Sequence, residues 1–249
     1  MSGHNKWSSI KHKKGAADAK RGKIFTKIVK EIIVSARDGG GDPDMNPRLR
    51  IAIAAAKAAN MPNSNVEKAI KRGTGEIEGV SYDSYTYEGY GHGGVAIIVE
   101  TLTDNKQRTV AEVRHAFSKY GGNLAESGSV SWMFDQKGLI LIKKDDIDED
   151  EIMMEALEAG ADDIATTDEF YEIYTPYAEL HNVLTKLEKT DYTIENAELT
   201  RIPQNTINAD DFAEKLFRLL DFMEDLDDVQ KVYANYEVSD EVMAKLAEN

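Results

Sequence analysis

The order of apolar segments after residue 137 constrains the fold of this 249-residue chain more than any other feature of its sequence. Short β-branched runs and helical patterns follow one another there as strand 139–143, helix 150–159, strand 163–166, strand 170–175, helix 177–187 and strand 193–201. This is the β-α-β-β-α-β order of a ferredoxin-like unit, and it is complete in itself. A helix at 212–223 and a strand at 229–236 follow, and they have no sheet of their own.

The leftover helix and strand have a place if they return to an earlier sheet. Residues 80–90 alternate aromatic and polar side chains and 95–102 form a β-branched run, which together predict a hairpin across the glycine-rich turn 89–94. A helix at 109–120 and a strand at 129–134 complete a β-β-α-β unit. We therefore expect a discontinuous domain that contains the ferredoxin-like unit as an insertion, since the ends of a compact unit usually lie close together.

The first part of the chain has a helical pattern. Apolar residues from Ile24 to Ile33 recur at the spacing of a buried helical face, and Asn46 before Pro47 reads as the N-cap of a second helix through 52–59. Ser64 and Glu67 match a capping box that opens a third helix ending at 72–73. The predicted fold class is α+β with three domains: a basic arm and helical domain at 1–78, a discontinuous α/β domain at 79–134 plus 206–239, and an inserted ferredoxin-like domain at 135–205.

Charge is divided unevenly between these parts. Residues 1–72 hold 16 Lys and Arg against 6 Asp and Glu, whereas the remaining residues hold 14 against 39. Because charges separated by more than about 8 Å of physiological saline are largely screened from each other, a basic end can attract a polyanion that the acidic body repels. The N-terminal part is therefore the predicted binding part.

The candidate binding residues are cations with one indole among them. Residues 1–22 have too little apolar surface to order alone, so we expect a flexible arm that contacts nucleic acid. Lys20, Lys23, Lys27 and Lys30 fall opposite the apolar stripe of the first helix and form a lysine ridge. The alternative is that these residues have no binding role. The tail is then simply solvated, Trp7 anchors it to the helical domain, and the lysine ridge is an ordinary exposed helix face. The predicted nucleic-acid-binding set is Lys6, Trp7, Lys11, His12, Lys13, Lys14, Lys20, Arg21, Lys23, Lys27, Lys30, Lys68, Lys71 and Arg72.

The segments that resemble catalytic or cofactor-binding motifs lack the neighbouring residues or elements that such sites need. Residues 89–94 match G-x-G-x-x-G but lead into a strand, whereas a dinucleotide site needs a helix there. Asp146, Asp148 and Asp150 resemble the start of a calcium loop, but Glu151 stands where glycine is required. Cysteine is absent, and the histidines show no metal-binding or catalytic spacing. We expect no enzyme activity, metal, cofactor or membrane span, and a cytoplasmic location.

Three motifs carry a resemblance to a known family. The opening run from Gly3 to Lys14, the Tyr87–Gly91 turn and the segment Gly128–Phe134 closely resemble the YebC/PmpR family of bacterial and organellar regulators, end to end. The resemblance implies three domains, one helical and two α/β. His92 departs from the pattern, since it stands where such proteins have proline.

The resemblance leaves two functions open. One is a DNA-binding transcriptional regulator, in which the basic residues neutralise phosphates without a visible base-reading cluster. The other is a ribosome-associated translation factor whose arm folds on structured ribosomal RNA. A hydrolase or nuclease ranks last, because no metal-binding or nucleophilic set is recognisable.

Overall fold

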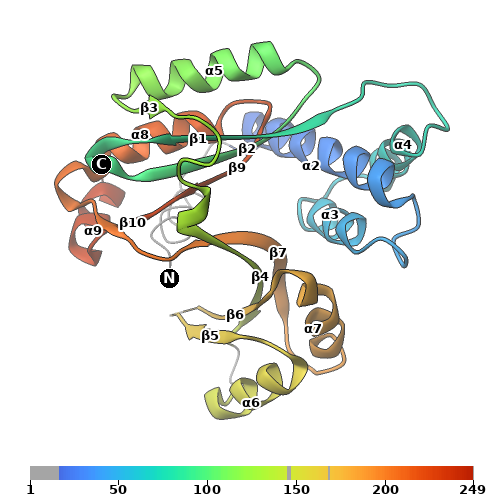
Figure 1. Cartoon of the computed structure of the whole chain (residues 1–249). Helices are drawn as coiled ribbons and strands as arrows, with labels where there is room; N and C mark the ends of the chain where they lie inside the picture. The colour runs from blue at the N-terminus through green and yellow to red at the C-terminus, as the bar shows by residue number, and fades with distance from the viewer. Residues whose placement is uncertain (1–16, 145–146, 168, 249) are drawn as a thin grey trace. The chain divides into compact units, whose positions relative to one another are not determined.

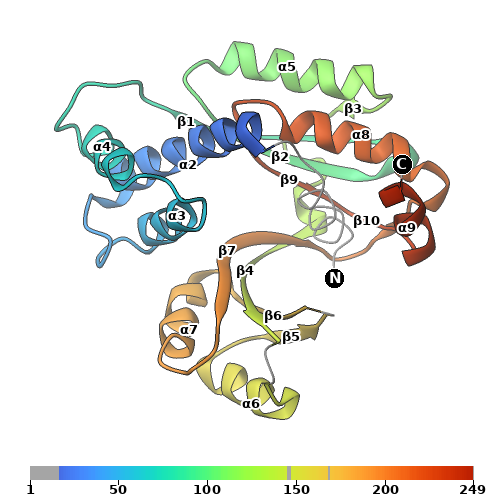
Figure 2. The same ribbon diagram turned by 180° about the vertical axis from the view of Figure 1, so that it is seen from behind.

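The structure, a computed structural model, describes residues 17–144, 147–167 and 169–248, and the side chains of residues 21–144, 147–167 and 169–246 (Figures 1 and 2). Contacts divide the chain into two compact units. One unit is Phe134–Ile202, and the other holds the described residues before 134 and after 202. In the part of the chain that is described, no helix is both long enough and apolar enough to cross a membrane.

Three helices form the N-terminal part, as expected. They are α2 (Ala17–Gly39), α3 (Pro47–Ala58) and α4 (Asn63–Gly73), and both shorter helices pack on α2. Their shared core contains Ile32, Leu49, Ala56 and Ala69, which are all buried. Because α2 begins at Ala17, residues 17–22 of the predicted flexible arm are helical.

The helix ends test two predicted caps. Asn46 caps α3 as predicted, since its Oδ1 accepts a hydrogen bond from the Leu49 amide at 3.1 Å. The capping box at Ser64 is wrong: Pro62 is the N-cap of α4, makes no side-chain cap bond, and leaves Ser64 inside the helix. Proline fits there because the first amides of a helix lack intrahelical partners.

A four-stranded sheet follows in the same unit. Its strands are β1 (Asp83–Tyr90), β2 (Ala96–Thr103), β3 (Asn123–Leu124) and β9 (Val229–Ala234), in the order β3-β1-β2-β9 with antiparallel neighbours. The helices α5 (Lys106–Lys119) and α8 (Ala213–Glu224) pack together over one face of this sheet (Figures 1 and 2). The late helix and strand therefore return to the early sheet, which confirms the discontinuous α/β topology.

Some segments around this sheet differ from the expectation. The predicted strand 129–134 is wrong, because Ser131–Met133 is a 3-10 turn and the third strand is the shorter β3. The strands β8 (Ile207–Asn208) and β10 (Tyr236–Glu237) form a separate parallel pair, and helix α9 (Asp240–Glu248) was not predicted. The turn after β1 contains a 3-10 segment, His92–Gly94, in which Gly93 and Gly94 have φ of 65° and 79°. This left-handed backbone favours glycine, so the motif is a hairpin turn as expected.

The unit Phe134–Ile202 contains the inserted domain. Its elements are β4 (Phe134–Lys143), α6 (Glu149–Ala159), β5 (Asp163–Thr166), β6 (Phe170–Pro176), α7 (Leu180–Leu187) and β7 (Ile194–Pro203), with a 3-10 turn at Tyr177–Glu179. The sheet order β5-β6-β4-β7 places the third strand between the first two, as in a ferredoxin-like fold. Buried Ile140, Ile152, Ile173 and Val183 contribute to the core, and the predicted fold class is confirmed.

Candidate nucleic-acid interface

The lysines of α2 contact the end of another helix in the same unit. Lys23 Nζ donates to the carbonyl oxygen of Asp225 at 2.9 Å, and Lys27 Nζ donates to that of Glu224 at 2.6 Å. Glu224 is the last residue of α8 and Asp225 is its C-cap. The last carbonyl groups of a helix lack intrahelical partners and carry partial negative charge, so ammonium groups stabilise them.

Lys30 lies deeper than its neighbours. Its side chain is 7% exposed, and its Nζ donates to Asp228 Oδ1 at 2.7 Å and to the Asp227 carbonyl oxygen at 2.9 Å. The exposed ridge predicted from the sequence is therefore wrong for Lys30, because α2 has a second contact face opposite its apolar stripe. Lys27 is half-buried, and Lys23 is exposed.

Asp228 is the centre of this contact. Its Oδ2 accepts hydrogen bonds from Thr103 Oγ1 at 3.0 Å, Thr109 Oγ1 at 2.8 Å and Arg108 Nη2 at 2.7 Å, while Lys30 holds Oδ1. Burial alone would raise the pKa of Asp228, but hydrogen bonds from Lys30, Arg108 and Thr109 and the Lys30 charge hold this pKa at about 2. One ionised carboxylate thus ties α2 to α5, to the end of β2 and to the start of β9.

A cavity of about 650 Å³ lies beside these contacts. Its charged lining includes Lys23, Lys30 and Arg108, but also five acidic residues: Asp104, Glu112, Asp225, Asp227 and Asp228. Two of the cations already hold Asp228. The acidic excess makes this cavity unfavourable for a phosphate group.

The cations of α4 are placed differently from those of α2. Lys68, Lys71 and Arg72, which we call the α4 cations, are all exposed, and so is Arg21 on α2. Among the described residues, none of the α4 cations forms an ion pair or a hydrogen bond through its charged group. The structure thus separates the predicted set into Lys27 and Lys30, which are turned inward, and cations that are exposed, which are Arg21, Lys23 and the α4 cations. The predicted residues Lys6, Trp7, Lys11, His12, Lys13 and Lys14 lie outside the described residues, as does the side chain of Lys20.

A second group of contacts, which the sequence did not predict, joins the Tyr87–Gly91 turn to the segment Gly128–Phe134. The buried carboxylate of Glu88 accepts backbone N–H groups from Gly128 at 2.8 Å, Val130 at 2.7 Å and Ser131 at 2.9 Å. Burial alone would raise the pKa of Glu88, but these three amides lower it below its usual value. The same loop holds Trp132, whose Nε1 donates to the Ser129 carbonyl oxygen at 3.0 Å and whose ring stays 66% exposed. The available signal was the acidic Glu88 between the aromatic Tyr87 and Tyr90 of β1.

Within the described ranges, no group of three or more His, Cys, Asp or Glu side chains is arranged to hold a metal ion. The carboxylates of Asp228 and Glu88 fasten elements of the protein together.

Comparisons with known proteins agree over the whole chain. A family model described as "TACO1/YebC protein N-terminal domain" matches residues 5–76, and one described as "TACO1/YebC second and third domain" matches residues 82–236. A protein of Persephonella marina is 60% identical over 250 aligned residues, which cover 99% of this chain and 100% of that protein. A protein of Geobacter sulfurreducens is 58% identical over 247 residues, with 99% and 100% covered. Both are named "probable transcriptional regulatory protein".

A solved structure shows the same fold. The crystal structure of a conserved hypothetical protein from Aquifex aeolicus superposes with a TM-score of 0.83 at 48% sequence identity. The alignment covers 90% of this chain and 93% of that one. This chain therefore shares its fold, with the helical domain, the discontinuous sheet and the inserted unit, with that protein.

Proposed function

Since the chain belongs to the TACO1/YebC family, we propose that it is a non-catalytic transcriptional regulator that binds DNA through its basic N-terminal part. Its relatives in Persephonella marina and Geobacter sulfurreducens carry the name of transcriptional regulators. The observation that supports the proposal most directly is the set of exposed α4 cations in a chain with a formal net charge of −15. The predicted arm, with its eight candidate residues, adds to the same end of the sequence.

The placement of the α4 cations favours contact with phosphates over base reading. Lys71 and Arg72 lie in the last turn of α4. Recognition helices of helix-turn-helix proteins instead contact base edges through residues near the helix N-terminus. Lysine binds phosphate as a point charge, and phosphate contacts fix position without carrying sequence information. We therefore expect binding that falls steeply with salt and depends weakly on sequence.

The α2 lysines have a supporting part in this proposal. Lys27 and Lys30 hold the α8 end and Asp228, so that the helical part is fastened to the sheet that follows it. Arg21 then remains on α2 as the described candidate for phosphate contact, because the exposed Lys23 also bonds to the end of α8. Binding then depends on the arm and on the α4 cations.

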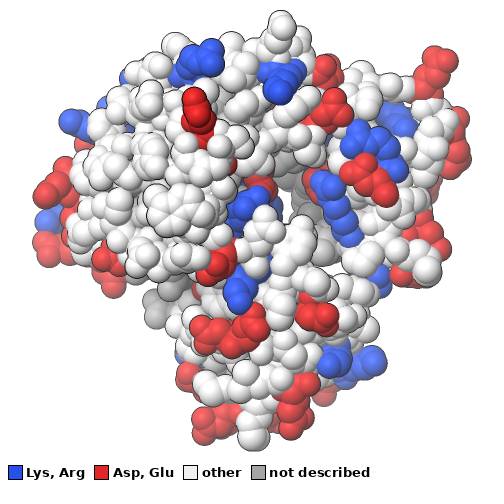
Figure 3. Space-filling model, in the orientation of Figure 1, with Lys and Arg blue, Asp and Glu red and all other residues white. Residues whose placement is uncertain are grey.

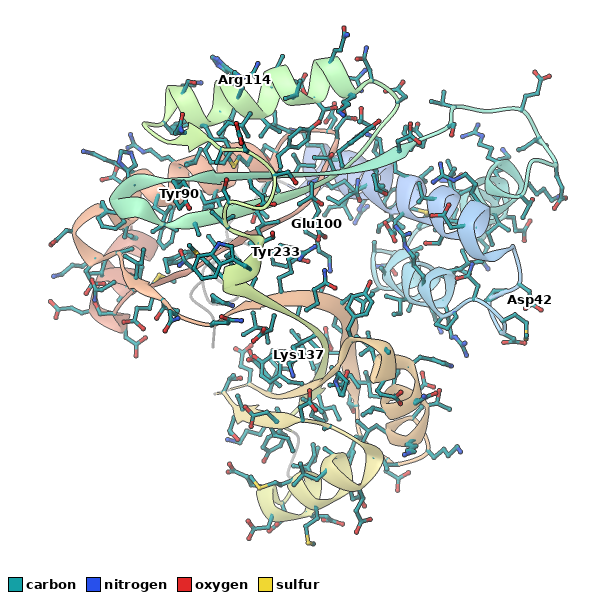
Figure 4. All side chains as sticks on the ribbon, viewed as in Figure 1. Asp42, Tyr90, Glu100, Arg114, Lys137 and Tyr233 are labelled. Carbon is teal, nitrogen blue, oxygen red and sulfur yellow. The ribbon has the colours of Figure 1, made fainter. Side chains whose placement is uncertain are left out.

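The test is a salt titration of duplex DNA binding with a variant in which Lys68, Lys71 and Arg72 are all replaced by Gln. Each lost phosphate contact removes about 0.9 from the slope of log affinity against log salt, so three contacts remove about 2.7. A matched control replaces Arg114, Lys119 and Lys215 by Gln, which changes the net charge equally. Arg114 lies on the outer side of α5, away from the sheet (Figure 4). We expect an unchanged slope for this control.

The same titration with structured RNA and with ribosomes separates the two nucleic-acid functions. Tighter binding to duplex DNA than to either, reduced by removing residues 1–16, is the expected result. Preferential sedimentation with ribosomes at physiological salt would instead identify a translation factor. Equal slopes for the α4 variant, the control variant and the unaltered protein would contradict the assignment of the α4 cations.

A further inference from the structure

Helix α6 of the ferredoxin-like unit leaves a strip of large apolar side chains uncovered. Ile152 and Ala156 face the core, while Met153, Met154 and Leu157 are 40%, 64% and 51% exposed. At about 100° per residue, these three side chains span roughly 100° of the helix on the side opposite the core. One 11-residue helix thus carries a third of the large apolar side chains that are exposed in the described part of the chain. A cluster of this kind marks an interaction surface more often than scattered single residues do.

Carboxylates border this strip. Glu149 lies on one side of it and Glu151 and Glu158 on the other, and all three are exposed. Figure 3 shows acidic side chains around uncharged surface at the bottom of the view, where Figure 1 draws α6. The sequence between Lys144 and Lys186 contains 14 Asp and Glu and no Lys or Arg. The local field around the strip is therefore strongly negative.

From these two observations we propose that the outer face of α6 docks a basic amphipathic helix of a partner protein. Apolar side chains of that helix cover Met153, Met154 and Leu157, and its Lys and Arg residues pair with the bordering carboxylates. Methionine suits such a surface, because its unbranched side chain adapts to the shape of the partner. Opposite charge speeds the encounter and selects the partner, while apolar burial supplies most of the affinity.

Charge argues against the other occupants of this face. A second copy of the chain would bring two sets of carboxylates together at the same strip, and like charges in a desolvated contact are unfavourable. Nucleic acid and anionic lipid surfaces are repelled for the same reason. The surface is therefore independent of the DNA function proposed above, and either can fail without the other.

Methyl NMR of the full chain tests the location. The probe is an 18-residue amphipathic helix made of Leu and Lys, titrated into protein labelled at the methyl groups of its 8 methionines. We expect the signals of Met153 and Met154 to shift, while that of Met45 stays in place, although Met45 is 79% exposed. Assignment uses single Met→Leu variants. A matched peptide of Leu and Glu should leave all signals unchanged.

Affinity measurements test the energetics. Replacing Met154 and Leu157 by Gln removes apolar surface without changing charge or helix propensity, and should weaken peptide binding about tenfold or more. Met45→Gln is the matched control and should change the affinity less than about twofold. Replacing Glu151 and Glu158 by Gln should weaken binding and flatten its salt dependence. Unchanged affinity of the Met154/Leu157 variant, equal binding of the Leu/Glu peptide, or a dimer of the unaltered protein that this variant dissociates would each overturn the proposal.

Discussion

The substitution Asp228→Asn isolates the charge that fastens α2 to the adjacent sheet. Asp228 is 3% exposed, its pKa is about 2, and its ordinary value is 3.8. One pKa unit corresponds to about 1.4 kcal/mol, so the ionised carboxylate contributes about 2.5 kcal/mol more to the free energy of unfolding than the neutral one. Asparagine has nearly the shape of the neutral acid, and we therefore expect a loss of about 2.5 kcal/mol at about pH 6.

The sign of the pH dependence follows from the lowered pKa. A group whose pKa is lower in the folded state stabilises the fold above its unfolded pKa, and this stabilisation is lost as the pH falls through the folded value. The difference between the two proteins should therefore be constant above about pH 5 and shrink towards zero near pH 2. Other carboxylates affect both proteins alike and cancel in the difference.

Urea unfolding followed by circular dichroism measures this difference at a series of pH values between about 6 and 2. The variant Asp225→Asn is the control: Asp225 contacts Lys23 only through its backbone carbonyl oxygen, so the loss of its carboxylate should be nearly neutral. A gap between Asp228→Asn and the unaltered protein that stays constant down to pH 2 would refute the assigned cause. So would a gap below about 0.5 kcal/mol at neutral pH, which is the range of ordinary surface substitutions.

Three further substitutions test contacts that hold the described elements. Asn46→Ala removes the α3 cap and the 2.8 Å bonds from Nδ2 to the Ser35 and Gly40 carbonyl oxygens, and should cost about 2 kcal/mol in urea unfolding. Glu88→Gln weakens three amide contacts and should cost about 1.5–3 kcal/mol near neutral pH; a Trp7→Phe background isolates the accompanying change in Trp132 emission. The cost should shrink at low pH, because the lowered pKa of Glu88 stabilises the fold only while the carboxylate is ionised. Gly73→Ala places a Cβ against the Ile33 carbonyl oxygen and should cost about 1–3 kcal/mol by thermal unfolding.

Elements with strong local patterns were predictable. The strand 163–166 matches β5 residue for residue, and the cap at Asn46 was recognised because an N-cap is a local contact between residues three apart. The ferredoxin-like order could also be predicted, since it depends only on the sequence of elements. In each of these cases, neighbouring residues or the order of the elements along the chain contain the information that the prediction needs.

The errors arise where a distant residue decides the local structure. Residues 129–134 have the composition of a strand, but Glu88 accepts the amides of Val130 and Ser131 there and of Gly128 just before, and the chain turns instead. Lys30 fits an exposed face by helical periodicity, but its partner Asp228 lies 198 residues away. Neither contact leaves a signal in the window that a periodicity argument uses.

The position of Lys30 also changes how the basic charge of the first 72 residues should be interpreted. Three cations of these 72 residues form hydrogen bonds within the protein: Lys23 and Lys27 with the end of α8, and Lys30 with Asp228. A count of Lys and Arg therefore overestimates the number of phosphate contacts, and the slope of affinity against salt should be shallower than the count implies. The same three bonds fasten the α2 helix that leads to the α4 cations. Their loss should therefore mainly lower the free energy of unfolding and change the slope of log affinity against log salt only slightly. Comparing these two effects in a Lys27→Gln variant distinguishes a fastening lysine from a phosphate-binding one.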